Sequence, residues 1–315
     1  MSAPSILVFY PNAGEARAYA DLIRLPRKGL TVHVASSFDE AAALIGGAEI
    51  LYAWHFPRRQ LPLATRLRWV QCMGAGVERF LGPELPPRVL VTRAAGIFGP
   101  WMAEYTLGRC LWVTQRIEHF RRQQAERQWA PIDPIPLRGQ TLCIVGLGDI
   151  GRHIGRMARG LGMKAIGVSR SGKRVKEADR VYRTDALRKA LAGADFVVVS
   201  APLSAETRGL IGAAELAAMK PSAWLINVAR GSIVEEKALV EALRERRIGG
   251  AVLDVFEQEP LPVDHPLWAL DNVALTPHIS GPSTPAEIAP IFNANLRRYF
   301  AGRPLRYAVD RKRGY

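Results

Sequence analysis

Short apolar runs alternate with segments of helical periodicity along most of the chain. In the N-terminal third, five such runs predict strands at Ile6–Tyr10, Thr31–Ala35, Ile50–Trp54, Trp69–Met73 and Val89–Thr92. Alanine- and leucine-rich pieces such as Phe38–Leu44 lie between them. Strands that alternate with helices indicate a parallel sheet covered by helices.

The middle of the chain repeats this pattern more clearly. These predict strands at Thr141–Val145, Ala165–Ser169, Phe196–Ser200, Trp224–Val228, Ala251–Val255 and Val273–Thr276. Nearly continuous apolar runs are typical of strands buried on both faces. Between the two blocks, Gly99-Pro100 interrupts the pattern, and one long helix is predicted from about Trp101 to Trp129. The fold class is therefore α/β, with a doubly wound parallel sheet.

Composition excludes several classes of protein. A chain of 315 residues with 48% hydrophobic and 23% charged residues is ordinary for a globular protein of about two domains. No apolar run approaches the roughly 18 residues that would span a bilayer, and the N-terminus resembles a first strand more than a signal peptide. Cys72, Cys110 and Cys143 lie in apolar segments without a Cys-x-x-Cys pair. We therefore expect reduced thiols, no metal site, no membrane association and a cytoplasmic location.

The net charge of +14 is unusual and has two interpretations. It could mark an anionic partner such as a phosphate, a carboxylate or a nucleic acid. It could equally be a solvated surface in an arginine-rich chain. The basic residues are scattered, with only short clusters such as Arg121-Arg122 and Arg246-Arg247. This distribution favours the solvated surface, and we expect no nucleic acid partner.

The motif Gly146-Leu147-Gly148-Asp149-Ile150-Gly151 directly follows a predicted strand and opens a helix with one apolar face. That context is the one required of a dinucleotide-binding turn. The first glycine permits a tight turn, the second lets the backbone approach a pyrophosphate, and the third lets helix and strand pack closely. A purely structural glycine-rich turn is the alternative.

The end of the next strand indicates which dinucleotide is bound. Folds that bind NAD usually place Asp or Glu there for the ribose 2′-hydroxyl. This chain instead has Ser169, Arg170, Ser171, Gly172 and Lys173, followed by another arginine. A loop rich in cations and hydroxyls suits a 2′-phosphate. The sequence therefore favours NADP(H), with NAD(H) possible and a basic surface loop as the alternative.

Three residues of complementary chemistry follow later strands. Arg230 ends one strand, Glu259 lies just after the next, and His278 closes the last. The carboxyl ends of parallel strands share one edge, where ligands bind. Arginine can grip a carboxylate with two hydrogen bonds, histidine can transfer a proton near neutral pH, and glutamate can orient the imidazole. The set fits hydride reduction of a 2-oxo acid, although each residue alone could be an ordinary surface group.

Taken together, the motifs resemble the D-2-hydroxyacid dehydrogenase family over essentially the whole chain. The matching stretches are Gly146–Gly151, Asn227–Gly231, Asp254–Pro260 and Pro277–Ile279. Within the family the chain most resembles the glyoxylate/hydroxypyruvate reductase A branch. That likeness is carried by Tyr52–His55, Met73–Val77, Trp101–Tyr105 and Val309–Tyr315.

The resemblance implies a role for each matching residue. Arg230 would bind the substrate carboxylate and carbonyl, His278 would protonate the carbonyl oxygen, and Glu259 would orient His278. Backbone amides of Gly74, Ala75 and Gly76 would bind the carboxylate, and Trp54 would line the substrate pocket, unless it is a core aromatic. The nicotinamide half would be contacted by Ala201, Pro202, Val228, Ala229, Arg230, Asp254, His278 and Gly281.

The resemblance also implies an organisation and an activity. A smaller, flavodoxin-like substrate domain would comprise residues 1–99 and 283–315, and a Rossmann cofactor domain residues 100–282. The expected activity is NADPH-preferring reduction of glyoxylate or hydroxypyruvate by a homodimer. The alternatives are an enzyme for another D-2-hydroxy acid with NAD(H), and a non-catalytic protein that senses nucleotides. A nucleic-acid binder driven by the net charge is the remaining possibility.

Overall fold

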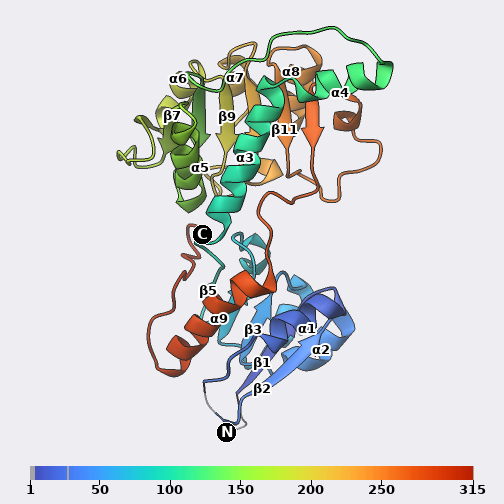
Figure 1. Cartoon of the computed structure of the whole chain (residues 1–315). Helices are drawn as coiled ribbons and strands as arrows, with labels where there is room; N and C mark the ends of the chain where they lie inside the picture. Colours follow the sequence, from blue (N-terminus) through green and yellow to red (C-terminus); the bar gives the residue numbers. More distant parts are fainter. Residues whose placement is uncertain (1–3, 27, 315) are drawn as a thin grey trace. The chain divides into compact units, whose positions relative to one another are not determined.

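The computed structural model describes residues 4–26 and 28–314, and the chain divides into two compact units (Figure 1). The smaller unit comprises Met1–Ile97 and Ser283–Tyr315, and the larger unit comprises Phe98–Pro282. The first division falls after Ile97 because helix α3 (Phe98–Thr114) begins at the next residue. The chain therefore crosses between the units twice, and each unit has its own sheet and core.

The smaller unit is built on a five-stranded parallel sheet of order β2-β1-β3-β4-β5. Its strands are β1 (Ser5–Phe9), β2 (Thr31–Ala35), β3 (Ile50–Ala53), β4 (Trp69–Cys72) and β5 (Leu90–Thr92). This order is that of a flavodoxin-like sheet, as expected. The strands β1, β3 and β4 are buried along their whole length, which explains why their sequences are apolar apart from Ser5 and Gln71.

Helices of different chemistry cover the two faces of this sheet. Helix α2 (Phe38–Ile45) contributes Ala41 and Ile45 to one apolar core. On the other face, α1 (Ala13–Asp21) and α9 (Pro285–Phe300) bring aromatic rings onto the strands. Phe292 of α9 stacks on Tyr52 with ring centroids 4.1 Å apart and lies 5.3 Å from Trp69. The C-terminal helix is thus integral to the fold of the N-terminal residues.

The larger unit contains a seven-stranded parallel sheet of order β12-β11-β10-β9-β6-β7-β8. Counted from β6, this is the strand order of a Rossmann fold with one added strand, so the predicted fold class is confirmed. Its strands are β6 (Thr141–Val145), β7 (Lys164–Ser169), β8 (Arg180–Arg183), β9 (Phe196–Val199), β10 (Trp224–Asn227), β11 (Gly250–Leu253) and β12 (Val273–Leu275).

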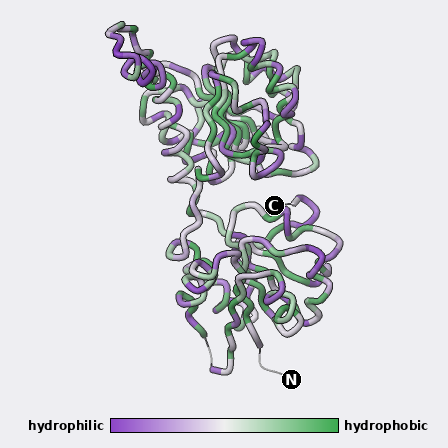
Figure 2. Tube along the Cα trace, turned by 90° about the vertical axis from the view of Figure 1, so that its right-hand side faces the viewer, coloured by the Kyte–Doolittle hydropathy of each residue, from purple (hydrophilic) through white to green (hydrophobic). Residues whose placement is uncertain are grey.

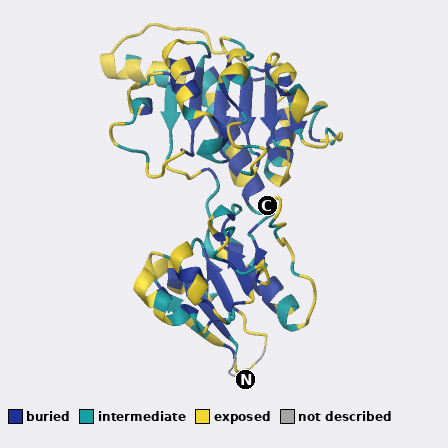
Figure 3. Cartoon of the chain, turned by 180° about the vertical axis from the view of Figure 1, so that it is seen from behind, coloured by how far each residue is buried: buried dark blue, intermediate teal, exposed yellow. Residues whose placement is uncertain are grey.

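Helices cover both faces of the larger sheet. Helix α3 packs along α5 (Asp149–Gly160), and Figure 1 shows both crossing the same face of the strands. Helices α6 (Leu187–Leu191), α7 (Ala213–Ala217) and α8 (Glu236–Arg244) share an apolar core with the sheet. Figure 3 shows the strands as the buried layer between exposed helical surfaces.

Two local predictions were wrong. The single helix expected over residues 101–129 is two helices, α3 and α4 (Ile117–Glu126), because Arg116 adopts a left-handed conformation with φ of 55°. The edge strand β8 was missed because its sequence, Arg180-Val-Tyr-Arg183, has charged residues at both ends and no fully buried residue. Edge strands commonly carry such charges. Among the described residues, no helix is both long and apolar enough to cross a membrane.

Candidate active site

The glycine-rich turn joins β6 to α5 and leaves room for a ligand. Gly146 has a φ of 108°, and a Cβ there would collide with the backbone of Ala201. A Cβ on Gly151 would overlap the carbonyl oxygen of Gly146. At Gly148, by contrast, no atom lies within 4 Å of the Cβ position. Two glycines are therefore needed for packing, and the middle one faces open space.

The start of α5 fits a diphosphate. Gly148 caps the helix without any side-chain hydrogen bond, so the first-turn amides are not capped by a neighbouring side chain. Helix N-termini with such amides bind anions. Leu147 packs against Gly167 of the next strand, and its carbonyl accepts a hydrogen bond from Arg152 Nε at 3.4 Å. Asp149 and Ile150 form the first turn of the helix.

The basic loop after β7 curls back on the strand end. Ser169 Oγ accepts a hydrogen bond from the Gly172 amide at 3.2 Å, and Gly172 has a φ of 64°. Ser171 Oγ accepts one from the Lys173 amide. Arg170 is exposed and lies 3.9 Å from Glu206, a weak surface pair. The loop therefore presents exposed cations beside a backbone turn, an arrangement that can bind a terminal phosphate group.

Arg230 follows β10 and is held by its own neighbours. Asn227 is buried, donates through Nδ2 to the Arg230 carbonyl at 3.1 Å and accepts the Ala229 amide through Oδ1. Arg230 Nη1 donates to the Ala229 carbonyl at 2.7 Å. A Cβ on Gly231 would overlap the backbone of Phe256, so this turn packs directly on the loop that carries Glu259.

Glu259 and His278 form a hydrogen-bonded pair. Glu259 Oε2 lies 2.9 Å from His278 Nδ1, and its other oxygen accepts the Phe256 amide at 3.0 Å. Burial alone would raise the pKa of Glu259, but the hydrogen bonds from His278 and Phe256 and the charges of His278 and Arg230 outweigh it, so the net pKa is lowered. Glu259 is thus kept ionised, and Arg230 is close enough to contribute. The structure brings the three predicted residues together.

Asp254 directly follows β11 (Gly250–Leu253) and is fully buried. Its Oδ1 accepts hydrogen bonds from Thr276 Oγ1 at 2.6 Å and the Ile279 amide at 2.9 Å. Its Oδ2 accepts the Ser280 amide at 2.8 Å. These bonds tie the carboxylate to the residues on both sides of His278. The sequence predicts that Asp254 contacts the nicotinamide. In the structure, the described partners of its carboxylate belong to residues 276–281, called the histidine loop below.

The other residues expected near the nicotinamide follow the ends of neighbouring strands in the larger unit. Ala201, Val228 and Ala229 are buried, and Pro202 accepts a hydrogen bond from Thr207 Oγ1 at 2.6 Å. A Cβ on Gly281 would lie 3.2 Å from the side chain of Met102 in α3. All of these positions lie on the sheet edge that carries the glycine-rich turn and His278.

In the smaller unit, Trp54 packs on the turn after β4. A Cβ on Gly74 would lie only 3.0 Å from the indole of Trp54. The Gly74 amide donates to Cys72 Sγ at 3.4 Å, and that thiol donates to the Gly76 carbonyl at 3.2 Å. Gly74 is buried, whereas Ala75 and Gly76 are partly exposed. Of the three predicted amides, that of Gly74 is therefore already bonded within the turn.

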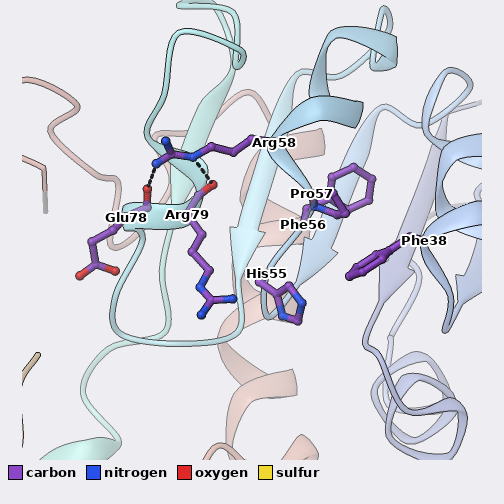
Figure 4. Close-up of a pocket in the computed structure, with 7 residues that line it drawn as sticks. All are labelled: Phe38, His55, Phe56, Pro57, Arg58, Glu78 and Arg79. Carbon is purple, nitrogen blue, oxygen red and sulfur yellow. Dashed lines mark hydrogen bonds between the residues drawn. The ribbon is translucent and has the colours of Figure 1, made fainter. Parts of the chain in front are cut away.

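A cavity of about 340 Å³ lies beside this turn and within the smaller unit (Figure 4). Arg58 spans its rim and donates to the carbonyls of Glu78 and Arg79. His55 packs edge-on against Phe9 and Phe38, and burial followed by the charge of Arg79 lowers its pKa. Phe38, Phe56 and Pro57 form the apolar part of the cavity wall, and His55 lies half-buried beside them.

Two further residues, Thr276 and Tyr105, support the histidine loop, and the sequence predicts no role for either. Thr276 bonds Asp254, and Tyr105 of α3 lies with its hydroxyl 2.6 Å from Thr276 Oγ1. They are far apart in sequence, and no local pattern indicates the contact. Among residues 4–26 and 28–314, no group of three or more His, Cys, Asp or Glu side chains is arranged to hold a metal.

Known proteins are similar to this chain in sequence. The model of the D-isomer specific 2-hydroxyacid dehydrogenase NAD-binding domain matches residues 107–280. A glyoxylate reductase of Aeropyrum pernix is 38% identical over 80% of this chain and 79% of its own length. A glyoxylate/hydroxypyruvate reductase A of Photorhabdus laumondii is 30% identical over 85% of this chain and 88% of its own.

Solved structures agree over the whole chain. A D-isomer specific 2-hydroxyacid dehydrogenase from Xanthobacter autotrophicus, in complex with NADPH and MES, has a TM-score of 0.87 and 34% identity, with 100% of both chains covered. An NADPH-dependent glyoxylate/hydroxypyruvate reductase from Sinorhizobium meliloti, in complex with NADP and sulfate, has a TM-score of 0.90 and 26% identity, covering 99% of this chain and 100% of that one.

Proposed function

This chain belongs to the D-isomer specific 2-hydroxyacid dehydrogenase family, and on that premise we propose that it reduces small 2-oxo acids, glyoxylate or hydroxypyruvate, with NADPH. The observation that carries the activity is the pairing of Glu259 with His278 on the sheet edge that holds Arg230 and the glycine-rich turn.

The cofactor is NADP(H), with NAD(H) as a weaker substitute. Three observations support this: no carboxylate follows β7, Arg170 and Lys173 are exposed there, and two structural relatives were solved with NADPH or NADP. The open space at Gly148 and the uncapped start of α5 fit the diphosphate. Bound there, the cofactor would supply the hydride.

The chain's own residues bind the substrate and move the proton. Arg230 would bind the carboxylate with its guanidinium, which is planar and permanently charged. Glu259 accepts the Nδ1 proton of His278, so Nε2 is the nitrogen left to serve the substrate oxygen. In reduction, doubly protonated His278 gives the Nε2 proton to the developing alkoxide, and Glu259 stabilises the cation before the transfer.

The smaller unit is proposed as the substrate domain and the larger unit as the cofactor domain. Within the turn after β4, the amides of Ala75 and Gly76 are the ones to bind the substrate carboxylate, because that of Gly74 bonds Cys72. Gly74 instead makes room for Trp54, whose indole would select against bulky substrates.

The chain is also proposed to be a homodimer located in the cytoplasm. Helix α4 has no buried residue. Residues 117–135 expose the large apolar side chains of Ile117, Phe120, Trp129, Ile132 and Ile135, with Trp129 97% exposed. Figure 2 shows this arm projecting from the larger unit. An exposed arm that carries several large apolar side chains among polar ones fits a self-association surface. Light scattering should give a mass of twice the 34.7 kDa of one chain, and Trp129→Glu should lower the measured mass.

Turnover with both nucleotides tests the activity and the cofactor together. Glyoxylate and hydroxypyruvate would each be mixed with NADPH and with NADH, and nucleotide oxidation followed by absorbance. The proposal expects turnover with at least one acid and a higher kcat/KM with NADPH. A preference for NADH would reject the account of the basic loop while retaining the reductase.

Absence of turnover with every 2-oxo acid tried would favour a nucleotide-sensing protein instead. Nucleotide binding, measured by calorimetry, separates the two outcomes. A sensor would bind NADPH tightly, and its binding of ligands would not depend on Arg230. A reductase would bind NADPH and also bind oxamate, an unreactive mimic of a 2-oxo acid, through Arg230.

A further inference from the structure

We propose that Tyr105 is a positioning residue for His278, acting through a hydrogen-bond chain that passes through Thr276 and Asp254. The chain links helix α3 to the histidine loop entirely within the larger unit. The inference rests on the proposed function, in which His278 is the proton donor, and it adds a residue outside the Arg230, Glu259 and His278 set.

The direction of the protons along this chain is fixed by chemistry. Thr276 has one hydroxyl proton, and its Oγ1 lies 2.6 Å from the carboxylate oxygen Oδ1 of Asp254. A carboxylate can only accept, so Thr276 donates to Asp254. The Tyr105 hydroxyl, 2.6 Å from the same Oγ1, must then donate to Thr276. Burial is the main cause that raises the pKa of Tyr105, so the phenol keeps this proton at neutral pH.

Asp254 passes this restraint to the backbone around His278. Its carboxylate accepts the amides of Ile279 and Ser280, at 2.9 and 2.8 Å. Its carbonyl oxygen accepts the His278 amide at 2.8 Å. His278 itself has a φ of 55°, a left-handed conformation that is unfavourable for a non-glycine residue and persists only where neighbours hold it. Asp254 supplies those holding contacts.

Tyr105 is well placed to anchor Asp254. It lies on α3, which packs along α5, and the guanidinium of Arg109 sits 4.8 Å from the centroid of its ring. One turn earlier on the same helix, Met102 packs against the end of the histidine loop at Gly281. The loop is therefore held against α3 by an apolar contact and by one chain of short hydrogen bonds.

Removing the Tyr105 hydroxyl should loosen the pairing of His278 with Glu259. The charged and titratable groups facing this region are Glu259, Arg230, Asp254 and Arg109, besides Tyr105 and His278 themselves. Tyr105→Phe removes the hydroxyl, with its hydrogen bonds to Thr276 and Arg109, and keeps the ring beneath Arg109. Weaker pairing lets the pKa of Glu259 rise toward its ordinary value, because the bond from His278 is part of what lowers it.

The test compares Tyr105→Phe with a matched control, Tyr182→Phe. Tyr182 has Arg180 4.6 Å from its ring centroid but lies in β8, at the opposite edge of the sheet from β12 and His278. Tyr105→Phe should lower kcat by about tenfold, since small misplacements of catalytic groups are costly. It should leave the KM for NADPH unchanged and shift the acid limit of the pH profile of kcat to higher pH. Tyr182→Phe should change none of these.

A double-mutant cycle with Thr276→Val tests the chain as a unit. Thr276→Val should reduce kcat more than Tyr105→Phe, because Asp254 loses a donor directly. Adding Tyr105→Phe to it should cost nothing further, whereas independent residues would give additive losses. Each variant's melting temperature is measured alongside, so a folding defect is recognised as such.

Nitrogen-15 spectra of the histidines provide a readout that needs no turnover. In the wild type, neutral His278 should be protonated at Nδ1, and Tyr105→Phe should give a mixture of the two tautomers. The His278→Gln spectrum assigns the signal. If no 2-oxo acid is reduced but the tautomer responds to Tyr105→Phe, the proposed function fails and the positioning role stands. A fixed tautomer, an unchanged pH profile, or additive losses in the cycle would each overturn the positioning role.

Discussion

The two units have sheets of similar construction but equip them differently. In the larger unit, the carboxyl edge of the sheet carries charged side chains held by hydrogen bonds, with Asp254 and Glu259 at the centre. In the smaller unit, the corresponding edge offers an indole and backbone amides beside a sheet locked by stacked aromatic rings.

In this protein, catalysis and stability therefore depend on different kinds of interaction. Reactive side chains need fixed directions, which hydrogen bonds supply, and such groups add little apolar burial. Aromatic packing supplies stability without directing any proton. Substitutions in the two regions should therefore separate, with activity lost in one and stability in the other.

The largest expected effect is on catalysis in the larger unit. His278→Ala removes the proton donor and should reduce kcat by about 10²–10⁴-fold in the nucleotide-oxidation assay. The melting temperature should change little, because the imidazole is partly exposed. A variant with near-normal turnover would contradict the role of His278.

The next effect is on stability in the smaller unit. Phe292 is fully buried between Tyr52 and Trp69, so Phe292→Ala should cost about 3–5 kcal/mol of folding free energy. Hydrogen exchange should rise in β3 and β4 and stay slow in β6 and β9. The exposed Phe120→Ala is the control, and equal acceleration in both sheets would deny that the units are separately stabilised.

A smaller effect concerns the choice of nucleotide. Arg170→Ala removes a cation beside the predicted 2′-phosphate and should raise the KM for NADPH by about tenfold, the equivalent of one charge-assisted hydrogen bond. The KM for NADH should not change. Arg174→Ala, in the same loop but four residues further on, is the comparison. If Arg170→Ala raised the KM for NADPH and the KM for NADH equally, its effect would come from the overall positive charge of the loop and not from a contact with the 2′-phosphate.

The smallest effect is the dependence of stability on pH. The pKa of Glu259 is lowered from 4.5, so its ionised form stabilises the folded protein at neutral pH. That contribution is lost as the pH falls through the lowered pKa. The difference in melting temperature between wild type and Glu259→Gln should therefore be largest near pH 7 and shrink below pH 4.5. A difference in melting temperature that grew as the pH fell would contradict the lowered pKa of Glu259.

The sequence predicted most of the fold because local patterns carry it. The buried parallel strands appear as apolar runs, and each predicted strand is present within two residues of its expected ends. The glycine-rich turn could be predicted from Gly146, Gly148 and Gly151, because a Cβ atom would collide with the backbone at two of these positions. Arg230, Glu259 and His278 could be grouped because parallel strands end on one edge.

Features that depend on contacts between residues far apart in the sequence could be seen only in the tertiary structure. The break at Arg116 leaves no local signal, and β8 is a strand only because it pairs with β7. The Gly74 amide turns inward because Cys72 lies beneath it. The link from Tyr105 to Thr276 joins residues 171 positions apart. Periodicity and turn chemistry act over a few residues, whereas hydrogen bonds between elements are set only when the sheet and its helices pack.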